Sequence, residues 1–206
     1  MGRGSVYMKR SNPKANRWQD HYTRRAKKEN FPARSVYKLE EIQQKYHLIK
    51  AGDAVLDLGC APGSWLLYAA KLTGERGRVV GIDLSPLQQQ PENVRVLTGD
   101  VLELNQELLA AVGTDFNVVL SDMAPATTGN RIVDTARSFN LCQAALSIAQ
   151  DLLLPGGAFV CKIFQGEDFK LFADLIKTLF SKHKIFKPQS SRKASREIFI
   201  IGMGKK

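Results

Sequence analysis

The chain has 206 residues, of which 44% are hydrophobic and 24% are charged, and its formal net charge is +10. This length suits one domain with a substantial core, and the composition is typical of a soluble globular protein. No apolar run is long enough to cross a bilayer, and the basic, polar N-terminus lacks the apolar core of a signal peptide. We therefore expect a cytoplasmic protein without a membrane partner.

The positive charge is concentrated at both ends of the chain. Residues 1–38 carry a net +9 and residues 182–206 carry +7, whereas residues 39–181 carry −6. A mildly acidic body with two basic ends favours a polyanionic partner, with RNA or DNA ahead of a membrane. The alternative is that each basic run is a solvated segment that only aids solubility.

Residues 1–32 are polar, basic and poor in aliphatic side chains. We expect a partly disordered arm that contains a helix from about Trp18 to Lys28 and is interrupted at Pro32. Ser35 has the character of a helix N-cap, and the apolar side chains after it recur at helical spacing: Val36, Leu39, Ile42 and Tyr46. The sequence thus predicts a basic RNA-binding arm over residues 1–32 and a folded domain over residues 33–206.

From residue 51 onward, apolar strands alternate with helices. The predicted strands are Ala54–Leu58, Arg78–Ile82, Val94–Thr98, Phe116–Ser121 and Ala158–Phe164. The predicted helices are Ser64–Leu72, Thr135–Leu153, which Pro155-Gly156-Gly157 would stop, and Asp168–Phe180. Two strands near Lys184–Lys187 and Arg196–Met203 follow, and their short connection predicts an antiparallel edge hairpin. The pattern indicates a Rossmann-like α/β fold, with a seven-stranded, mostly parallel sheet and helices on both faces.

A glycine-rich turn, Asp57-Leu-Gly-Cys-Ala-Pro-Gly63, joins the first predicted strand to the next helix. Gly59 and Gly63 permit a sharp turn and the close approach of a ligand, and Pro62 stiffens the loop. The spacing is not G-x-G-x-x-G, and no Gly-Lys-Ser/Thr follows. A nucleoside without phosphates is therefore favoured over a dinucleotide or a nucleoside triphosphate, which argues against a nicotinamide-dependent oxidoreductase.

Two acids support a nucleoside ligand. Asp83 ends the second strand, where a carboxylate can accept hydrogen bonds from ribose hydroxyls, and Asp100 follows the third strand, where it can accept from an adenine amino group. Trp65 could pack beside the site. Either acid alone could be an ordinary strand-end residue, but the two together after this turn indicate S-adenosylmethionine.

Four residues are candidates for the chemistry. Asp122 follows the fourth strand in SDMAP, and Lys162 lies inside the otherwise apolar strand AFVCKIF. A lysine there is costly unless it is paired or reaches a cleft, although it could also extend to the surface at a strand end. Lys38 and Glu197 are weaker candidates from pattern alone, because a surface role is as reasonable for each. The three cysteines, Cys60, Cys142 and Cys161, form no CxxC pair, so we expect neither a disulfide framework nor a bound metal.

Five segments of the chain together resemble a known family: VYKLEEI, DLGCAPGSW, SDMAP, VCKIFQG and SREIFI. In the same order and over nearly the whole chain, they resemble the FtsJ/RrmJ (RlmE) ribose 2'-O-methyltransferases. The resemblance implies S-adenosylmethionine as cofactor and a catalytic tetrad of Lys38, Asp122, Lys162 and Glu197. The expected cofactor site comprises Gly63, Trp65, Asp83, Asp100 and Asp122, together with Gly59, Ala61 and Pro62 of the turn. Cys60 and Ser64 depart from the family pattern, where Ala and Gly are common, but both are small.

The resemblance also suggests a mechanism and a substrate. A ribose 2'-hydroxyl would attack the methyl group in line, with Lys162 removing or orienting the hydroxyl proton, Lys38 as a neighbouring cation, and Asp122 and Glu197 positioning the lysines. The expected substrate is RNA rather than DNA, namely a uridine in the A loop of 23S rRNA within the large ribosomal subunit. We expect a monomer that binds phosphates through basic residues at both ends: Lys9, Arg10, Lys14, Arg17, Arg24, Arg25, Lys27, Lys28, Lys182, Lys184, Lys187, Arg192, Lys193 and Arg196.

Two alternatives stay open at this point. The same chemistry could act on the ribose of a tRNA or of an mRNA cap. The protein could also be an RNA-binding ribosome assembly factor whose main role is not methylation. Trp18, Tyr22 and Phe31 could stack on bases or pack the arm onto the body.

Overall fold

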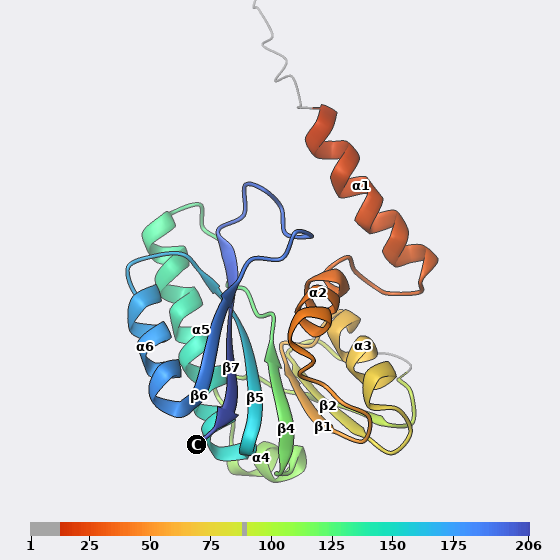
Figure 1. Ribbon diagram of the computed structural model, residues 1–206, viewed down its shortest axis with the longest axis vertical. Coiled ribbons are helices and arrows are strands. Elements are labelled where there is room, and N and C mark those ends of the chain that lie inside the picture. Colours follow the sequence, from red (N-terminus) through yellow and green to blue (C-terminus); the bar gives the residue numbers. More distant parts are fainter. Residues whose placement is uncertain (1–12, 88–89) are drawn as a thin grey trace, which may run out of the picture.

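The computed structural model describes residues 13–87 and 90–206, and the side chains of residues 13–20 are outside that description. The described chain forms a seven-stranded sheet in the order β3-β2-β1-β4-β5-β7-β6 (Figure 1). The strands are β1 Ala54–Leu58, β2 Arg78–Asp83, β3 Val94–Thr98, β4 Phe116–Ser121, β5 Leu153–Phe164, β6 Phe180–Phe186 and β7 Glu197–Lys205.

The direction of the strands confirms the expected fold class. Neighbouring strands from β3 to β5 are all parallel. β7 pairs antiparallel with both β5 and β6, so it is the reversed strand between two that run the same way. The predicted hairpin therefore exists, and β6 forms the outer edge.

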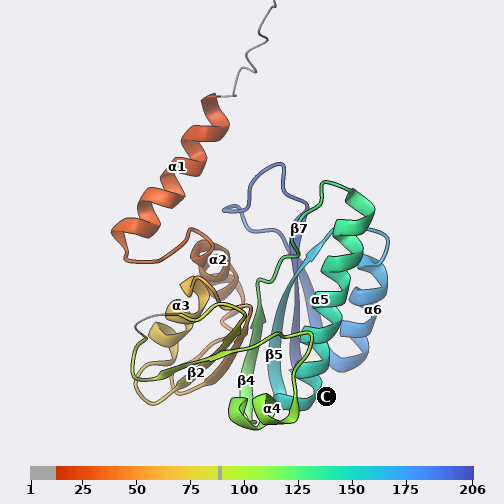
Figure 2. The ribbon, with the colours of Figure 1, turned by 180° about the vertical axis from the view of Figure 1, so that it is seen from behind.

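Helices cover both faces of the sheet (Figures 1 and 2). One face carries α4 (Gln106–Val112), α5 (Arg131–Leu152) and α6 (Phe169–Leu179), and the other carries α2 (Val36–Tyr46) and α3 (Ser64–Thr73). Alternate residues of each central strand point to opposite faces, so Leu56 and Leu58 join the first core and Val55 joins the second. None of the described helices combines the length and the low polarity needed to span a bilayer.

Several predicted boundaries were wrong. The helix predicted from Thr135 begins at Arg131, because the side chain of Asn130 accepts hydrogen bonds from the first-turn amides of Ile132 and Val133. It ends at Leu152, and the chain passes directly into β5, so that Pro155-Gly156-Gly157 lies at a register shift within this strand instead of stopping the helix. β6 begins at Phe180 rather than near Lys184, and the short helix α4 was not predicted.

The N-terminal helix α1 spans Pro13–Lys28, five residues more than predicted, and its first half stands away from the body (Figure 1). Its last turn is anchored. Ala26 and Phe31 are buried with Val36 and Tyr37, and the Tyr22 ring lies 5.2 Å from that of Tyr37. Tyr22 and Phe31 thus pack onto the body, whereas the side chain of Trp18 is outside the described residues.

Candidate active site

The carboxyl ends of the parallel strands surround a cavity of about 610 Å³. Ligands of open α/β sheets bind at this edge, because the loops that leave the strands diverge there. The lining residues come from the loops after four strands and from α5: Gly59, Ala61, Asp83, Leu84, Gly99, Asp100, Val101, Leu102, Asp122, Met123, Ala124, Pro125, Arg137, Asn140 and Leu141. Three of the predicted acids and two residues of the glycine turn therefore meet at one site.

The glycine turn is held in a conformation that requires glycine. Gly59 has a φ of +72°, and a Cβ atom on it would collide with the side chain of Met123. Its amide and that of Cys60 donate to the carbonyl of Ile82, at 2.8 and 3.1 Å, which ties the turn to β2. Gly63, with a φ of +103°, directly precedes α3.

Asp83 and Asp100 each have a structural partner as well as a place on the cavity wall. Asp83 accepts hydrogen bonds from the amides of Ala61 and Ser85, both at 2.9 Å, and Asp100 accepts one from the amide of Leu102 at 2.8 Å. A carboxylate has about four lone-pair sites, so both acids keep capacity to accept from a ligand. Asp83 and Asp100 can therefore be structural residues at strand ends and ligand-binding residues at the same time.

Three predicted cofactor residues are not brought to the cavity wall. Pro62 is exposed and Gly63 is buried, and neither belongs to the lining. Trp65 is only 3% exposed; its ring stacks on Phe199 at 5.6 Å, and its indole N–H donates to the carbonyl of Ser35 at 2.8 Å. The side chain of Trp65 is a core element that fixes α2 to α3, which leaves only its backbone for contact with a ligand.

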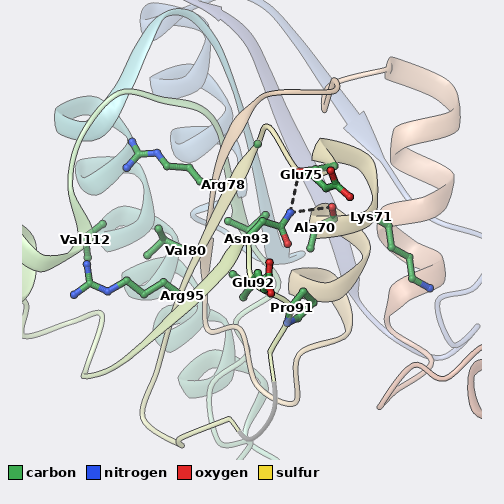
Figure 3. Close-up of a pocket in the computed structure, with 14 residues that line it drawn as sticks. Ala70, Lys71, Glu75, Arg78, Val80, Pro91, Glu92, Asn93, Arg95 and Val112 are labelled. Carbon is green, nitrogen blue, oxygen red and sulfur yellow. Dashed lines mark hydrogen bonds between the residues drawn. The ribbon is translucent and has the colours of Figure 1, made fainter.

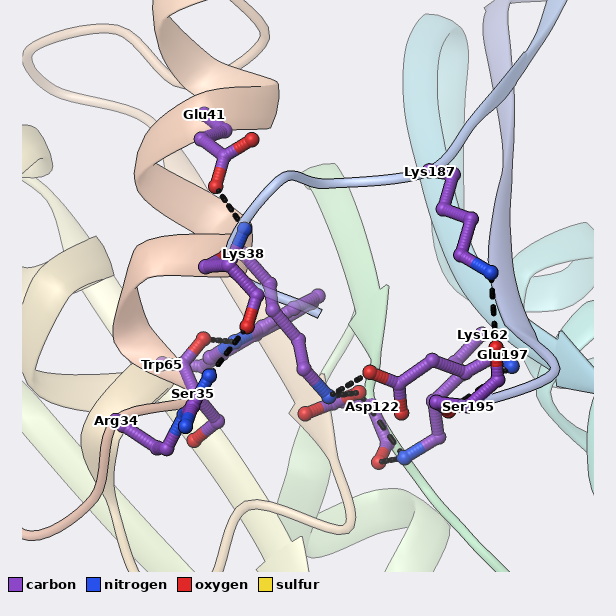
Figure 4. A network of polar contacts seen from close by, with 11 residues as sticks. Arg34, Ser35, Lys38, Glu41, Trp65, Asp122, Lys162, Lys187, Ser195 and Glu197 are labelled. Carbon is purple, nitrogen blue, oxygen red and sulfur yellow. Dashed lines mark hydrogen bonds and ion pairs between the residues drawn. The ribbon is translucent and has the colours of Figure 1, made fainter. Parts of the chain in front are cut away.

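The predicted tetrad forms one network (Figure 4). Lys162 Nζ lies 3.0 Å from Asp122 Oδ1 and also donates to the Asp122 carbonyl. Lys38 Nζ lies 3.5 Å from the same Oδ1 and 3.0 Å from Glu197 Oε1. Four side chains from the ends of β4, β5 and β7 and from α2 therefore meet beside the cavity.

The sheet topology explains this meeting. Because β7 is antiparallel to β5, its first residue, Glu197, lies at the carboxyl end of β5, opposite Phe164. Lys162 pairs with Phe199 two positions further on, so Lys162 and Glu197 are diagonal neighbours on one face of the sheet. That face is covered by α2, which supplies Lys38.

Burial and pairing together define the charge state of the network. Lys162 is only 6% exposed, and the four formal charges cancel, which a low-dielectric site requires. Burial alone would raise the pKa of Glu197, but Lys38, with help from Lys162, outweighs it and holds this pKa below its usual range. Glu197 therefore stays ionised and keeps Lys38 in place.

The sequence analysis missed two kinds of residue. Arg137, Asn140 and Leu141 line the cavity from α5, where no motif distinguishes them from other helical residues. Asp57 is fully buried in β1 behind the cavity, and burial, followed by the charges of Asp122 and Asp83, raises its pKa well above the usual range. A single carboxylate inside the apolar strand AVLDL was a signal that could have identified it.

A second hollow of about 850 Å³ lies at the opposite end of the sheet (Figure 3). Its polar side chains bond to backbone carbonyls at the ends of helices. Asn93 donates to the carbonyls of Ala70 and Gly74 near the end of α3, and Arg95 donates to that of Ala111 near the end of α4. These contacts complete helix ends, so the side chains already have a structural use.

Exposed basic side chains lie on two segments, the loop between β6 and β7 and the helix α1. The loop of residues 187–196, between β6 and β7, exposes Arg192, Lys193 and Arg196. Arg24, Lys27 and Lys28 are exposed on α1, whereas Lys9 and Arg10 and the side chains of Lys14 and Arg17 lie outside the described residues. Within residues 13–87 and 90–206, no group of three or more His, Cys, Asp and Glu is arranged to hold a metal ion.

Solved structures share this architecture. The chain is similar to the crystal structure of a protein described as a ribosomal RNA methyltransferase from Plasmodium falciparum, with a TM-score of 0.76, 25% identity, and coverage of 85% of this chain and 98% of that one. Fibrillarin from Aeropyrum pernix, solved with S-adenosyl-L-methionine bound, has a TM-score of 0.57 and 17% identity over 76% of this chain and 68% of its own. This second likeness shows the fold alone.

Sequence comparison extends the likeness over the whole chain. A protein of Desulforapulum autotrophicum named ribosomal RNA large subunit methyltransferase E is 60% identical over 96% of this chain and 98% of its own length. A protein of the same name from Desulfatibacillum aliphaticivorans is 54% identical over 97% of each chain. The FtsJ-like methyltransferase family model matches residues 31–205. The chain therefore belongs to the FtsJ-like methyltransferase family.

Proposed function

We propose that this protein transfers a methyl group from S-adenosylmethionine to a ribose 2'-hydroxyl of large-subunit ribosomal RNA, at a uridine of the A loop of 23S rRNA. The observation that carries the proposal is the paired Lys38–Asp122–Lys162–Glu197 network, which borders the cavity at the carboxyl edge of the sheet through Asp122. The high identity to proteins named ribosomal RNA large subunit methyltransferase E supports the choice of RNA.

The residues of the cavity fit this cofactor. The volume of about 610 Å³ suits a ligand of nucleoside size, because small-molecule pockets commonly span about 300–1,000 Å³. Asp83 would accept from the ribose and Asp100 from the adenine amino group, while Leu102 and Pro125 supply apolar wall. The first-turn amides of α3, which include that of Trp65, have no carbonyl partner within the helix. They therefore favour binding of a negatively charged group such as the carboxylate of the cofactor.

Lys162 is the residue that acts on the nucleophile. When bound, S-adenosylmethionine would supply a methyl group on a positively charged sulfur. As the bond to the ribose 2'-oxygen forms, the sulfur–methyl bond would break to leave a neutral thioether, and the hydroxyl proton would pass to water. In the described structure the Lys162 ammonium donates to the Asp122 carbonyl and forms an ion pair with Asp122 Oδ1 at 3.0 Å. Because an ammonium group has three N–H donors, it keeps capacity to orient a substrate hydroxyl beside the cavity. Alignment of this kind lowers a barrier by up to roughly 7–11 kcal/mol in the best cases.

The other three tetrad residues keep Lys162 in position. Asp122 forms ion pairs with both lysines through one oxygen, Oδ1, and borders both the network and the cavity. Lys38 connects Asp122 to Glu197, whose carboxylate closes the network on the side of β7. The arrangement holds the hydroxyl-orienting amine against the wall of the cofactor cavity, where the methyl group must be presented.

The proposed function is tested by methyl transfer from labelled S-adenosylmethionine to large ribosomal subunits that lack the modification. Intact subunits, free 23S rRNA and bulk tRNA are compared, and the methylated ribose is mapped. We expect incorporation at one uridine of the large-subunit RNA. Preferred labelling of tRNA would overturn the substrate, and absence of labelling in every RNA would overturn the function.

Salt provides a second test of RNA binding. The exposed residues Arg192, Lys193 and Arg196 are proposed to neutralise backbone phosphates, so the logarithm of the association constant should fall linearly with that of the salt concentration. Arg192→Ala should reduce the steepness of this fall by about one unit, the effect of a single lost phosphate contact. A slope near zero for the unchanged protein would contradict binding through phosphates.

A further inference from the structure

We propose that Glu41 is a positioning residue that latches the loop of residues 187–196 beside the tetrad, so that this loop can hold RNA phosphates next to the target ribose. The inference rests on the proposed function, because it assigns this loop to the same RNA substrate. Glu41 lies one helical turn after Lys38 on α2, within the segment VYKLEEI, in which Lys38 is the residue predicted for the site.

Both oxygens of the Glu41 carboxylate are used on the loop. Oε2 accepts a hydrogen bond from the amide of Gln189 at 2.6 Å, and Oε1 accepts one from the amide of Ser190 at 2.8 Å. Two consecutive backbone amides that donate to one carboxylate form charge-assisted hydrogen bonds, which are stronger than two neutral ones. The contact joins positions 148 and 149 residues apart in the chain.

A second latch comes from Arg34, which donates to the carbonyl of Ser190 at 2.6 Å. The residues that flank Arg34 are themselves fixed to the first turn of α3. The hydroxyl of Ser64 bonds the amide and the carbonyl of Ala33 at 2.7 and 3.0 Å, and the indole of Trp65 donates to the carbonyl of Ser35. The loop is thus seated on a rigid base that continues into the cofactor turn.

The loop is folded so that its cations face outward. A turn from Pro188 to Ser191 is buried against α2, and a second turn joins the amide of Ser195 to the carbonyl of Arg192. Lys187 closes the base of the loop by donating to the carbonyl of Ser195 at 2.8 Å. The exposed Arg192 and Lys193 belong to the second turn, a few residues before Glu197 of the tetrad.

The charges around the latch favour a phosphate as the group that the exposed cations of this loop would bind. Burial, and then the charge of Arg192, lower the pKa of Arg34, so two guanidinium groups are close enough to repel each other. An anion between them would relieve this repulsion. A carboxylate such as Glu41 beside an RNA-binding loop repels phosphates directly. Any favourable effect of Glu41 on RNA binding must therefore come from ordering the loop that carries the cations.

Repulsion of phosphate and ordering of the loop change RNA binding in opposite directions, so the variant Glu41→Ala distinguishes them. If Glu41 latches the loop, KM for the RNA substrate rises by at least about tenfold, because two charge-assisted hydrogen bonds to the loop are lost, despite the gain in net positive charge. The value of kcat at saturating RNA and the Kd for S-adenosylmethionine should stay within about twofold. Glu41→Gln, which keeps one acceptor oxygen, should give an intermediate KM. Glu75→Ala removes the same charge from an exposed site at the other end of the sheet and serves as the matched control.

Limited trypsin digestion, resolved by mass spectrometry, tests the latch without any RNA. Glu41→Ala should speed cleavage after Arg192 and Lys193 several-fold, while Glu75→Ala leaves it unchanged. An unchanged or lower KM for RNA, or unchanged cleavage in the loop, would overturn the proposal. If the unchanged protein methylates no RNA, the proposed function fails, but the digestion still reports on the latch independently.

Discussion

The two ends of the sheet both carry a hollow lined with charged residues, but they use those charges differently. At the amino end, Arg95 and Asn93 are bonded to carbonyls at helix ends, and the hollow is the larger of the two, at about 850 against 610 Å³. At the carboxyl end, Lys38, Asp122 and Lys162 are largely buried and bonded to one another across separate elements.

The difference teaches that cavity size does not identify the site in this fold. A side chain that caps a helix end would be present whether or not a ligand binds. Buried charges that pair only with one another contribute little net stability, since their desolvation offsets their attraction. Their presence at the carboxyl end therefore needs a chemical reason, which methyl transfer supplies.

The largest expected effect contrasts Lys162→Ala with Arg95→Ala. Removal of the hydroxyl-orienting amine should lower kcat by about a thousandfold, within the range observed for acid–base and positioning groups. Binding of S-adenosylmethionine, measured by calorimetry, should survive within about twofold. Arg95→Ala should keep kcat within about twofold and lower the unfolding free energy by less than about 1 kcal/mol.

Loss of folding could imitate loss of chemistry at Lys162, because truncation leaves Asp122 with fewer partners. Lys162→Met keeps the length and apolar stem of the side chain and should lose turnover to the same extent. Circular dichroism of both variants verifies the fold. Turnover retained in a folded Lys162 variant, or lost in Arg95→Ala, would reverse the assignment of the two ends.

A smaller effect distinguishes Gly59, in the turn before α3, from Gly74, the residue that follows α3. Both have a positive φ, +72° and +66° respectively. An added Cβ meets open space at Gly74 but collides with Met123 at Gly59. Gly74→Ala should cost only the backbone strain, about 2 kcal/mol of unfolding free energy, because its φ of +66° and ψ of −172° lie in a region that is essentially restricted to glycine. Gly59→Ala should cost roughly 3 kcal/mol and weaken S-adenosylmethionine binding about a hundredfold, because Met123 must also move.

Chemical denaturation and calorimetry on the two glycine variants provide these values. Equal losses of cofactor affinity in both would mean that the turn at Gly59 is not specifically shaped for the ligand. A Gly59→Ala protein with unchanged affinity would move the cofactor away from this turn.

The smallest effect concerns Asp57 and the pH dependence of stability. Its pKa is raised in the folded protein, so above its ordinary value of 3.8 the unfolded chain loses a proton that the folded chain keeps. Stability from this group is thus full below that pH and is lost as pH rises toward the folded pKa. Asp57→Asn cannot ionise, so its Tm should gain on that of the unchanged protein as the pH rises above 3.8, over the interval in which the unfolded chain is ionised at this position and the folded chain is not. A Tm difference that stays constant over this interval would mean that Asp57 is ionised when folded.

Most of the fold could be predicted because its signals are local. Short, mostly apolar strands such as Ala54–Leu58, with turns after them, specify a parallel sheet buried on both faces. Boundaries failed where a single contact decided them. The side chain of Asn130 starts α5 early, and strand pairing with Phe116 draws Leu153 out of the helix and into β5.

The candidate site, like the fold, could be predicted from the sequence only in part. The positions of Asp83, Asp100 and Asp122 at strand ends follow from the sequence, because parallel strands bring their carboxyl ends to one edge. The side chain of Trp65 could not be placed, since whether it faces the cavity or the core depends on how α2 packs against α3.

The sequence by itself determined the alternation of strands and helices, the glycine turn and the acids at strand ends, because each depends on neighbouring residues and on the period of a strand or helix. Only the tertiary structure decided that Lys38 and Glu197 belong with Asp122 and Lys162. That grouping requires the reversed strand β7, which carries its first residue to the carboxyl end of β5, and the packing of α2 over the same face. The Glu41 latch likewise exists only because two segments nearly 150 residues apart meet at this edge.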